Sequence, residues 1–198
     1  MEEIDIIISK DGREFVVYSG ISDKLLHQLI TFSSVYDEAV QRFTGDSERF
    51  MSEEKTILWL QDNGRRVYTL VPKDDREVLA GFSWLRADEQ DFTLDTVSNP
   101  ELFTEYQTTW GRWIHTVATR LYGDFRGQRL ATPFMESVHR DYVAHGGWNI
   151  TGILAIIHRD NIPSQKLSER LGYQYLWLRG DRVLWILNST NIQRYIGE

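Results

Sequence analysis

The sequence of 198 residues contains no cysteine. Disulfides, thiolate metal sites and a cysteine nucleophile are therefore excluded. No apolar run approaches the ~20 residues needed to span a bilayer, and the acidic start of the chain lacks the apolar core of a signal peptide. Internal repeats, low-complexity tracts and linker-like stretches are absent as well. We therefore expect one soluble, cytoplasmic domain over residues 1–198, with no membrane partner.

Basic residues are also fewer than acidic residues. The chain has 22 Lys and Arg against 29 Asp and Glu, which gives a formal net charge of −7. Phosphate backbones are bound by clustered Lys and Arg, so nucleic acid is not the expected partner. Apolar residues make up 41% and aromatic residues 13% of the chain, which is enough to bury the core of a single domain.

The clearest pattern in the sequence runs from residue 113 to residue 173. An apolar, β-branched run at 114–119 predicts a strand. A helix is predicted over about 130–145, because Leu130, Phe134, Val138 and Tyr142 recur at spacings of four. A second apolar run at 150–157 and a short helix at about 162–171, ended by Gly172, follow. This order predicts two parallel strands joined through a helix.

The flanking segments predict further strands and helices. Residues 4–9 and 14–18 surround Asp11-Gly12, a strong hairpin signal. A helix is predicted over 22–32, capped by Ser22 or Asp23, and a second over 34–42, whereas 47–61 is ambiguous. Strands are predicted at 67–71, 78–85, 173–178 and 183–187, and residues 87–111 look irregular. The simplest assembly is an α/β (α+β) fold with one mixed sheet and helices on both faces.

Two motifs in the central stretch could carry chemistry. The first motif runs from Arg126 to Ala131. Its Gly127 would allow a positive φ and the close approach of a ligand. The backbone N–H groups at the start of the next helix could bind an anion. The same pattern also occurs in ordinary surface loops. The second motif runs from Asn161 to Tyr173. It has a polar stripe of Asn161, Ser164 and Ser168 beside an apolar stripe of Pro163, Leu167 and Leu171. There Asn161 could equally be a helix cap, with both serines solvated.

Together, the two motifs resemble the GNAT superfamily of acyl-CoA-dependent N-acyltransferases. The family's phosphate loop reads Gln or Arg, two residues, Gly, one residue, then Gly or Ala. Here it begins at Arg126 and ends at Ala131, with Arg129 at the inner Gly position. The later family pattern is matched by Asn161, Ser164, Glu169-Arg170 and Leu171-Gly172-Tyr173. Ser164 is the variant typical of the branch related to ribosomal-protein N-terminal acetyltransferases. The resemblance covers residues 112–187.

The resemblance implies a mostly antiparallel mixed sheet of about seven strands with a splayed central parallel pair. Acetyl-CoA would be the co-substrate, bound in the split between those two strands, and the fold is compatible with a homodimer. The first strand, at Thr119 and Leu121, would pair with the pantetheine arm, and a backbone N–H there would stabilise the oxyanion. The other implied coenzyme-binding residues are Arg126, Gly127, Gln128, Arg129, Leu130, Ala131, Asn161 and Ser164.

The catalytic residues are less clearly indicated. Many family members have a tyrosine acid at the position of Ser168, whose hydroxyl is a poor acid. The thiolate could therefore leave unprotonated, or Tyr106, Tyr122 or Tyr173 could substitute. His115 lies where some members place a catalytic Glu, and its ordinary pKa of roughly 6.5 suits a general base. It could equally be a core histidine, and His158 is a second candidate. The five histidines show no metal-ligand spacing, so no metal site is expected.

The segment between Arg86 and Arg112 contains six acidic residues, four aromatic residues and no basic residue. It is either a solvated acidic loop or a binding segment for a cationic amine, such as a polyamine-like molecule or a peptide N-terminus. The expected activity is acetyl transfer from acetyl-CoA to a primary amine by direct attack. The rivals are a longer acyl donor, a CoA-binding module without catalysis, and an interaction domain that binds no nucleotide.

Overall fold

The structure is a computed structural model that describes residues 1–33, 37–61, 65–88, 114–145, 150 and 152–196. It consists of two compact units. Unit 1 comprises residues 1–84 and 119–138, and unit 2 comprises residues 85–118 and 139–198. None of the helices in these described ranges is long and apolar enough to cross a membrane.

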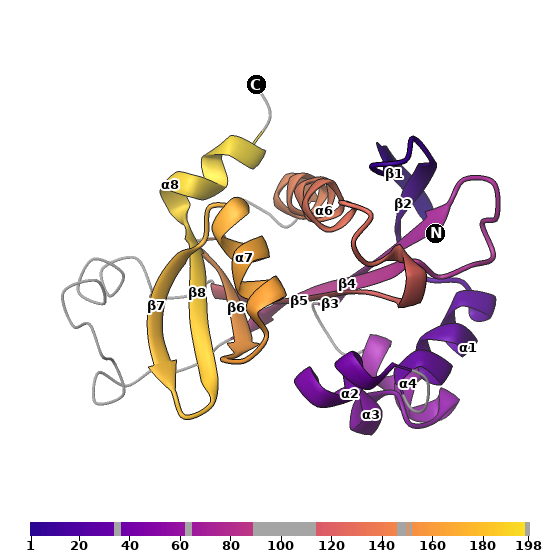
Figure 1. Ribbon diagram of the computed structural model, residues 1–198, viewed down its shortest axis with the longest axis horizontal. Helices are drawn as coiled ribbons and strands as arrows, with labels where there is room; N and C mark the ends of the chain where they lie inside the picture. Colours follow the sequence, from indigo (N-terminus) through magenta and orange to yellow (C-terminus); the bar gives the residue numbers. More distant parts are fainter. Residues whose placement is uncertain (34–36, 62–64, 89–113, 146–149, 151, 197–198) are drawn as a thin grey trace. The chain divides into compact units, whose positions relative to one another are not determined.

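Unit 1 contains the N-terminal hairpin, three strands that follow it in the sheet, and a group of four helices (Figure 1). The α1 helix begins after Ser22, whose side chain accepts a hydrogen bond from the N–H of Leu25. Its elements are β1 (Glu2–Ile8), β2 (Glu14–Ser19), α1 (Asp23–Thr31), α2 (Glu38–Phe43), α3 (Asp46–Arg49), α4 (Glu53–Gln61), β3 (Arg65–Pro72), the start of β4 (Gly81–Asp88), the end of β5 (Ile114–Leu121), the short 3-10 helix η3 (Gly123–Phe125) and the first half of α6 (Ala131–His145).

Unit 2 contains the remainder of β4, β5 and α6, together with the C-terminal elements. These are β6 (Gly152–His158), α7 (Ile162–Arg170), β7 (Gln174–Arg179), β8 (Arg182–Asn188), α8 (Ser189–Ile192) and the 3-10 helix η4 (Gln193–Tyr195). The strands β7 and β8 form an antiparallel hairpin, and β8 also pairs with β6 along its whole length.

The strands form one mixed sheet in the order β1-β2-β3-β4-β5-β6-β8-β7. The sheet has eight strands, which matches the eight strand segments predicted from the sequence patterns and is one more than the number that the family resemblance implies. As predicted, β5 and β6 are parallel, with register from Ile114↔Gly152 to Val117↔Ala155. Both strands continue beyond the last of these pairs, so the ladder ends before the strands do.

The predicted helix–strand pattern of the central stretch is confirmed. Leu130, Phe134, Val138 and Tyr142 are all buried, with exposed fractions of 0 to 3%, so the spacing of four marks the inner face of α6. In α7, Leu167 and Leu171 are buried, but Pro163 is exposed in the first turn. The apolar stripe of α7 therefore contains two residues rather than three.

Several predicted boundaries shift. The helix expected from residue 34 begins at Glu38, because Asp37 caps it through the N–H of Val40. The strand expected from residue 78 begins at Gly81, and the ambiguous region 47–61 contains α3 and α4. Most of the segment expected to be irregular, together with Tyr106, lies outside the described residues.

Candidate coenzyme site

The predicted phosphate loop connects β5 to α6 within unit 1. After β5, η3 makes one tight turn, and the N–H of Arg126 donates to the carbonyl of Gly123 at 3.2 Å. The chain then reaches Leu130, which is fully buried and whose carbonyl accepts the N–H of Phe134 at 3.0 Å. Leu130 thus anchors the start of α6, and the residues before it form an exposed or half-buried loop.

The backbone of this loop is left-handed at two positions. Gly127 has φ +73° and Arg129 has φ +60°. A Cβ added at Gly127 would meet no atom within 4 Å, so the turn requires glycine there for its φ and not for space. Arg129 is the single non-glycine residue with positive φ in the described part of the chain, a conformation that costs about 1–2 kcal/mol. It therefore adopts the backbone conformation that the glycine of the family pattern would take.

The backbone N–H groups at the end of this loop have no acceptor in the part of the chain that the structure describes. No hydrogen bond among the described residues uses the backbone N–H of residues 128–132, and Pro133 has no N–H to satisfy. Successive N–H groups at the start of a helix of 15 residues favour an anion. The side chain of Arg129 is exposed beside them. The donor set therefore fits a diphosphate such as that of coenzyme A.

Arg126 has partners that the sequence did not reveal. Its Nε donates to the carbonyl of Leu121 at 2.8 Å, and its Nη2 donates to the Asp37 carboxylate at 2.5 Å. Asp37 is 6% exposed and also caps α2. Arg126 therefore links the turn after β5 to the start of α2.

In unit 2, the second motif places Asn161 at the start of α7. Its side-chain oxygen accepts the N–H of Ser164 at 3.3 Å, which is the capping role considered above. Ser164 is half-buried and Ser168 is 5% exposed. The carbonyl of Ser168 accepts the N–H of Tyr173 at 2.9 Å, which closes the end of the helix.

The candidate base His115 is buried in unit 2. Its Nδ1 is hydrogen-bonded to the hydroxyl of Tyr142 on α6, and the two rings meet edge to face at 5.4 Å. The Nε2 atom is buried, and no described residue is hydrogen-bonded to it. Burial lowers the pKa of His115 to about 4, so the imidazole is neutral at pH 7 and is a weak base.

The other acid–base candidates have different surroundings. His158, at the end of β6, lies 3.4 Å from Asp181 and 3.8 Å from Asp160. Tyr122 and Tyr173 are buried, and burial raises the pKa of each phenol well above its usual value. Both phenols therefore stay protonated at neutral pH. No group of His, Asp and Glu within the described ranges could hold a metal ion.

Comparison with known proteins gives a result for structure alone. No protein-family model and no curated protein matches the sequence. The GNAT domain of S. lividans PAT has a TM-score of 0.66 at 13% identity, over 93% of this chain and 96% of its own. The spermidine N-acetyltransferase from Vibrio cholerae, in complex with CoA and spermine, has a TM-score of 0.61 at 11% identity, over 90% of this chain and 98% of its own.

RimL, a ribosomal alpha-N-protein acetyltransferase in complex with coenzyme A, has a TM-score of 0.56 at 16% identity, over 94% of this chain and 98% of its own. These structural similarities extend over nearly the full length of this chain and of each solved structure, at sequence identities of only 11 to 16%. The mixed sheet with its parallel β5–β6 pair, the β5–loop–α6 connection and these neighbours agree, and the chain has the fold of the GNAT acetyltransferases.

Proposed function

We propose that this chain is a single-domain N-acetyltransferase that transfers an acetyl group from acetyl-CoA to a primary amine. The observation that carries the proposal is the loop before α6. It combines unused N–H groups at residues 128–132 with two left-handed residues, on a fold whose solved neighbours include proteins in complex with coenzyme A. A loop that only connected two elements would not need a strained Arg129.

The coenzyme would be held mainly through its phosphates and its pantetheine arm. Arg126, Gly127 and the N–H groups of Gln128 to Ala131 would contact the diphosphate, with Arg129 adding charge. The backbone of β5 at Thr119 and Leu121, beyond the last β5–β6 pair, would bind the pantetheine amides. Asn161 and Ser164 are proposed coenzyme-binding residues on the strength of the second motif alone, and Asn161 is also the helix cap.

The chemistry is direct attack. The amine loses a proton to a base, its nitrogen forms a bond to the thioester carbon, and the carbon–sulfur bond breaks to release the thiolate. His115 could accept the proton through its unpartnered Nε2, but its lowered pKa makes it weak. The better-exposed His158 remains the second candidate. With serine at position 168, we propose that the thiolate leaves without a tyrosine acid.

The acceptor is proposed to be a cationic amine, a small molecule or a peptide N-terminus, in a cytoplasmic protein. The neighbours include a spermidine and an aminoglycoside acetyltransferase, which supports an amine acceptor without naming this one. A homodimer is compatible with the proposal.

The test is release of free CoA thiol from acetyl-CoA across a panel of polyamines, amino sugars and peptides. We expect amine-dependent release by the wild type and about a tenfold or greater rise in KM for acetyl-CoA in Gly127→Val, because a branched residue resists positive φ. Binding of CoA by calorimetry without release for any amine would favour the non-catalytic module. No binding of CoA would refute the proposal.

A further inference from the structure

The N-terminal hairpin contacts the phosphate loop and the 3-10 turn η3 that precedes it, all within unit 1. The N–H of Lys10, at the hairpin tip, donates to the carbonyl of Gln128 at 3.0 Å. Phe15 on β2 meets Phe125 edge to face, with ring centroids 5.8 Å apart. Such contacts fix the hairpin against the loop at more than one point, so a tip residue can hold the loop in one orientation.

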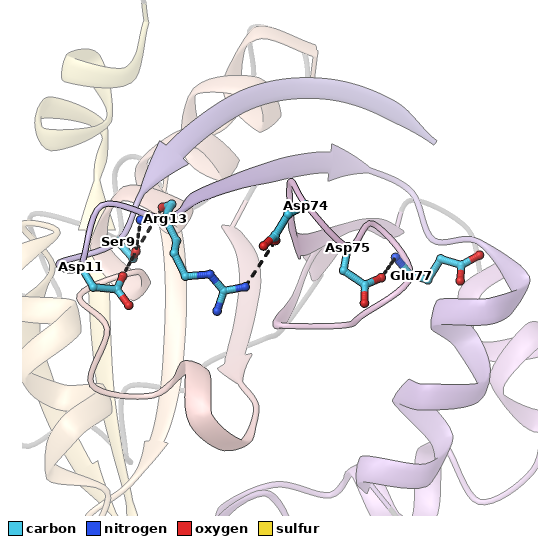
Figure 2. A network of polar contacts seen from close by, with 6 residues as sticks. All are labelled: Ser9, Asp11, Arg13, Asp74, Asp75 and Glu77. Carbon is cyan, nitrogen blue, oxygen red and sulfur yellow. Dashed lines mark hydrogen bonds and ion pairs between the residues drawn. The ribbon is translucent and has the colours of Figure 1, made fainter.

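The tip itself is well supported (Figure 2). Ser9 is 6% exposed, and its hydroxyl donates to the carboxylate of Asp11 and accepts the N–H of Arg13 at 3.0 Å. The guanidinium of Arg13 then pairs with Asp74, in the turn after β3, at 3.3 Å. The hydrogen bond from Ser9 is the main cause that lowers the pKa of Asp11. The carboxylate therefore stays charged and keeps this bond at neutral pH.

The turn places Lys10 where its N–H points away from the hairpin ladder. The N–H of Gly12 donates to the carbonyl of Ser9 at 3.1 Å, which makes Lys10 and Asp11 the two central residues of a β-turn. Neither has a positive φ, whereas Gly12 has φ +85°. This is a type I turn followed by a left-handed glycine, and its first central position accepts proline readily.

The contact at Gln128 sets the direction of the next N–H group. In a trans peptide the C=O of one residue and the N–H of the next point in opposite directions, and the chain has no cis peptide bond among its described residues. With the Gln128 carbonyl held toward Lys10, the N–H of Arg129 points to the other side of the loop. The same contact supports the left-handed conformation of Arg129.

We propose that Lys10 is a positioning residue of the coenzyme site, acting through its backbone N–H and not through its charge. By holding the Gln128 carbonyl, it aims the N–H of Arg129 at the coenzyme diphosphate. This inference rests on the proposed function of the loop. In this proposal the hairpin, which contains none of the motif residues, helps to form the coenzyme site.

Two substitutions at one position test it. Lys10→Pro removes the N–H while suiting the turn, and Lys10→Ala removes the side chain while keeping the N–H. One lost positioned hydrogen bond should weaken CoA binding about two- to tenfold in Lys10→Pro. Lys10→Ala should bind CoA like the wild type. The melting temperatures of the two unliganded variants should agree to within about 2 °C.

Kinetics give a second readout that a merely structural contact would not produce. Because the diphosphate is remote from the reacting carbon, Lys10→Pro should raise KM for acetyl-CoA and leave kcat unchanged. Ser9→Ala, which loosens the tip without altering Lys10, should shift CoA affinity in the same direction by a smaller factor. If Lys10→Pro fails to fold, the CoA affinity of Ser9→Ala tests the positioning role of Lys10 instead.

The outcomes separate the two proposals. Equal CoA affinity in the wild type, Lys10→Pro and Ser9→Ala would overturn the positioning role and leave the proposed function intact. Equal loss in Lys10→Ala and Lys10→Pro would also overturn it, since the charge would then be the cause. A wild type that does not bind CoA would refute the proposed function, and the inference with it.

Discussion

At the scale of single residues, two buried histidines make stability depend on pH. Burial lowers the pKa of His115 to about 4, and burial with the nearby Arg194 lowers that of His139 to about 3. Both are neutral in the folded protein, but in the unfolded chain both gain a proton near pH 6.5. Protons therefore bind the unfolded state first, and acid favours unfolding.

We expect the free energy of unfolding to be constant above about pH 7 and to fall as the pH drops from about 6.5 toward 4. Each histidine contributes a slope of up to about 1.4 kcal/mol per pH unit. Urea titrations at several pH values measure this slope. In His115→Asn this slope should be smaller by the contribution of one histidine. An unchanged slope would contradict the burial of a neutral His115.

The same residue shows the limit of sequence reasoning. The pattern placed His115 on the central strand, but it could not choose between a base and a core histidine. The partner that decides its environment, Tyr142, lies on the inner face of α6. Its phenol contacts Nδ1, so Nε2 can accept a proton from substrate only in the tautomer whose Nδ1–H donates to that phenol.

At the scale of secondary-structure elements, local signals predicted most of the fold. The hairpin followed from Asp11-Gly12, and α6 and α7 followed from apolar spacing and their terminal residues, because turn chemistry and periodicity are properties of adjacent residues. Contacts between distant residues were not predictable in the same way. Asp37 and Arg126 are ordinary polar residues in the sequence, and only the fold pairs them.

A second such contact is the buried ion pair between β5 and α3. Arg120 is 7% exposed and Asp46 is fully buried, and the two side chains form an ion pair. The guanidinium also lies 5.7 Å from the ring of Phe82. No described residue is hydrogen-bonded to its Nε or Nη1 atom, so among these residues Asp46 is the main compensation for the buried charge.

We expect Asp46→Ala to destabilise the protein by about 3–5 kcal/mol, because it leaves the Arg120 charge buried without a counter-ion. The measurement is equilibrium unfolding in urea. The matched control is Glu14→Ala, which removes an exposed partner of Lys73 at 2.9 Å and should cost about 1 kcal/mol or less. Similar losses in the two variants would show that Arg120 is compensated by other groups.

At the scale of the whole molecule, the sequence predicted the kind of sheet and its strands, but not the residues at which the parallel ladder ends. Parallel pairing of β5 and β6 followed from the strand–helix–strand order. The residue pair at which the β5–β6 ladder ends, Val117↔Ala155, did not. Where two strands stop pairing depends on the packing of the rest of the chain, which no local pattern contains.

Net charge also acts at this scale. The protein carries −7, which attracts cations and repels a polyanion such as coenzyme A. A cationic acceptor would therefore benefit from the acidic segment between Arg86 and Arg112, which falls largely outside the described residues. Under the proposed function, the coenzyme would be recognised at short range by the loop N–H groups and Arg129, where the repulsion from the net negative charge is weaker than their direct attraction.

The combined variant Asp95→Asn, Glu101→Gln and Glu105→Gln tests whether this segment recognises the amine. We expect KM for the amine to rise and its dependence on salt to shrink, while KM for acetyl-CoA stays the same. The matched control neutralises three exposed acids elsewhere, Glu2, Glu54 and Glu169, and so changes the net charge by the same amount. If both triple variants raise KM equally, net charge alone attracts the amine. If neither does, the acidic segment is a solvated surface, and recognition of the acceptor must come from other residues.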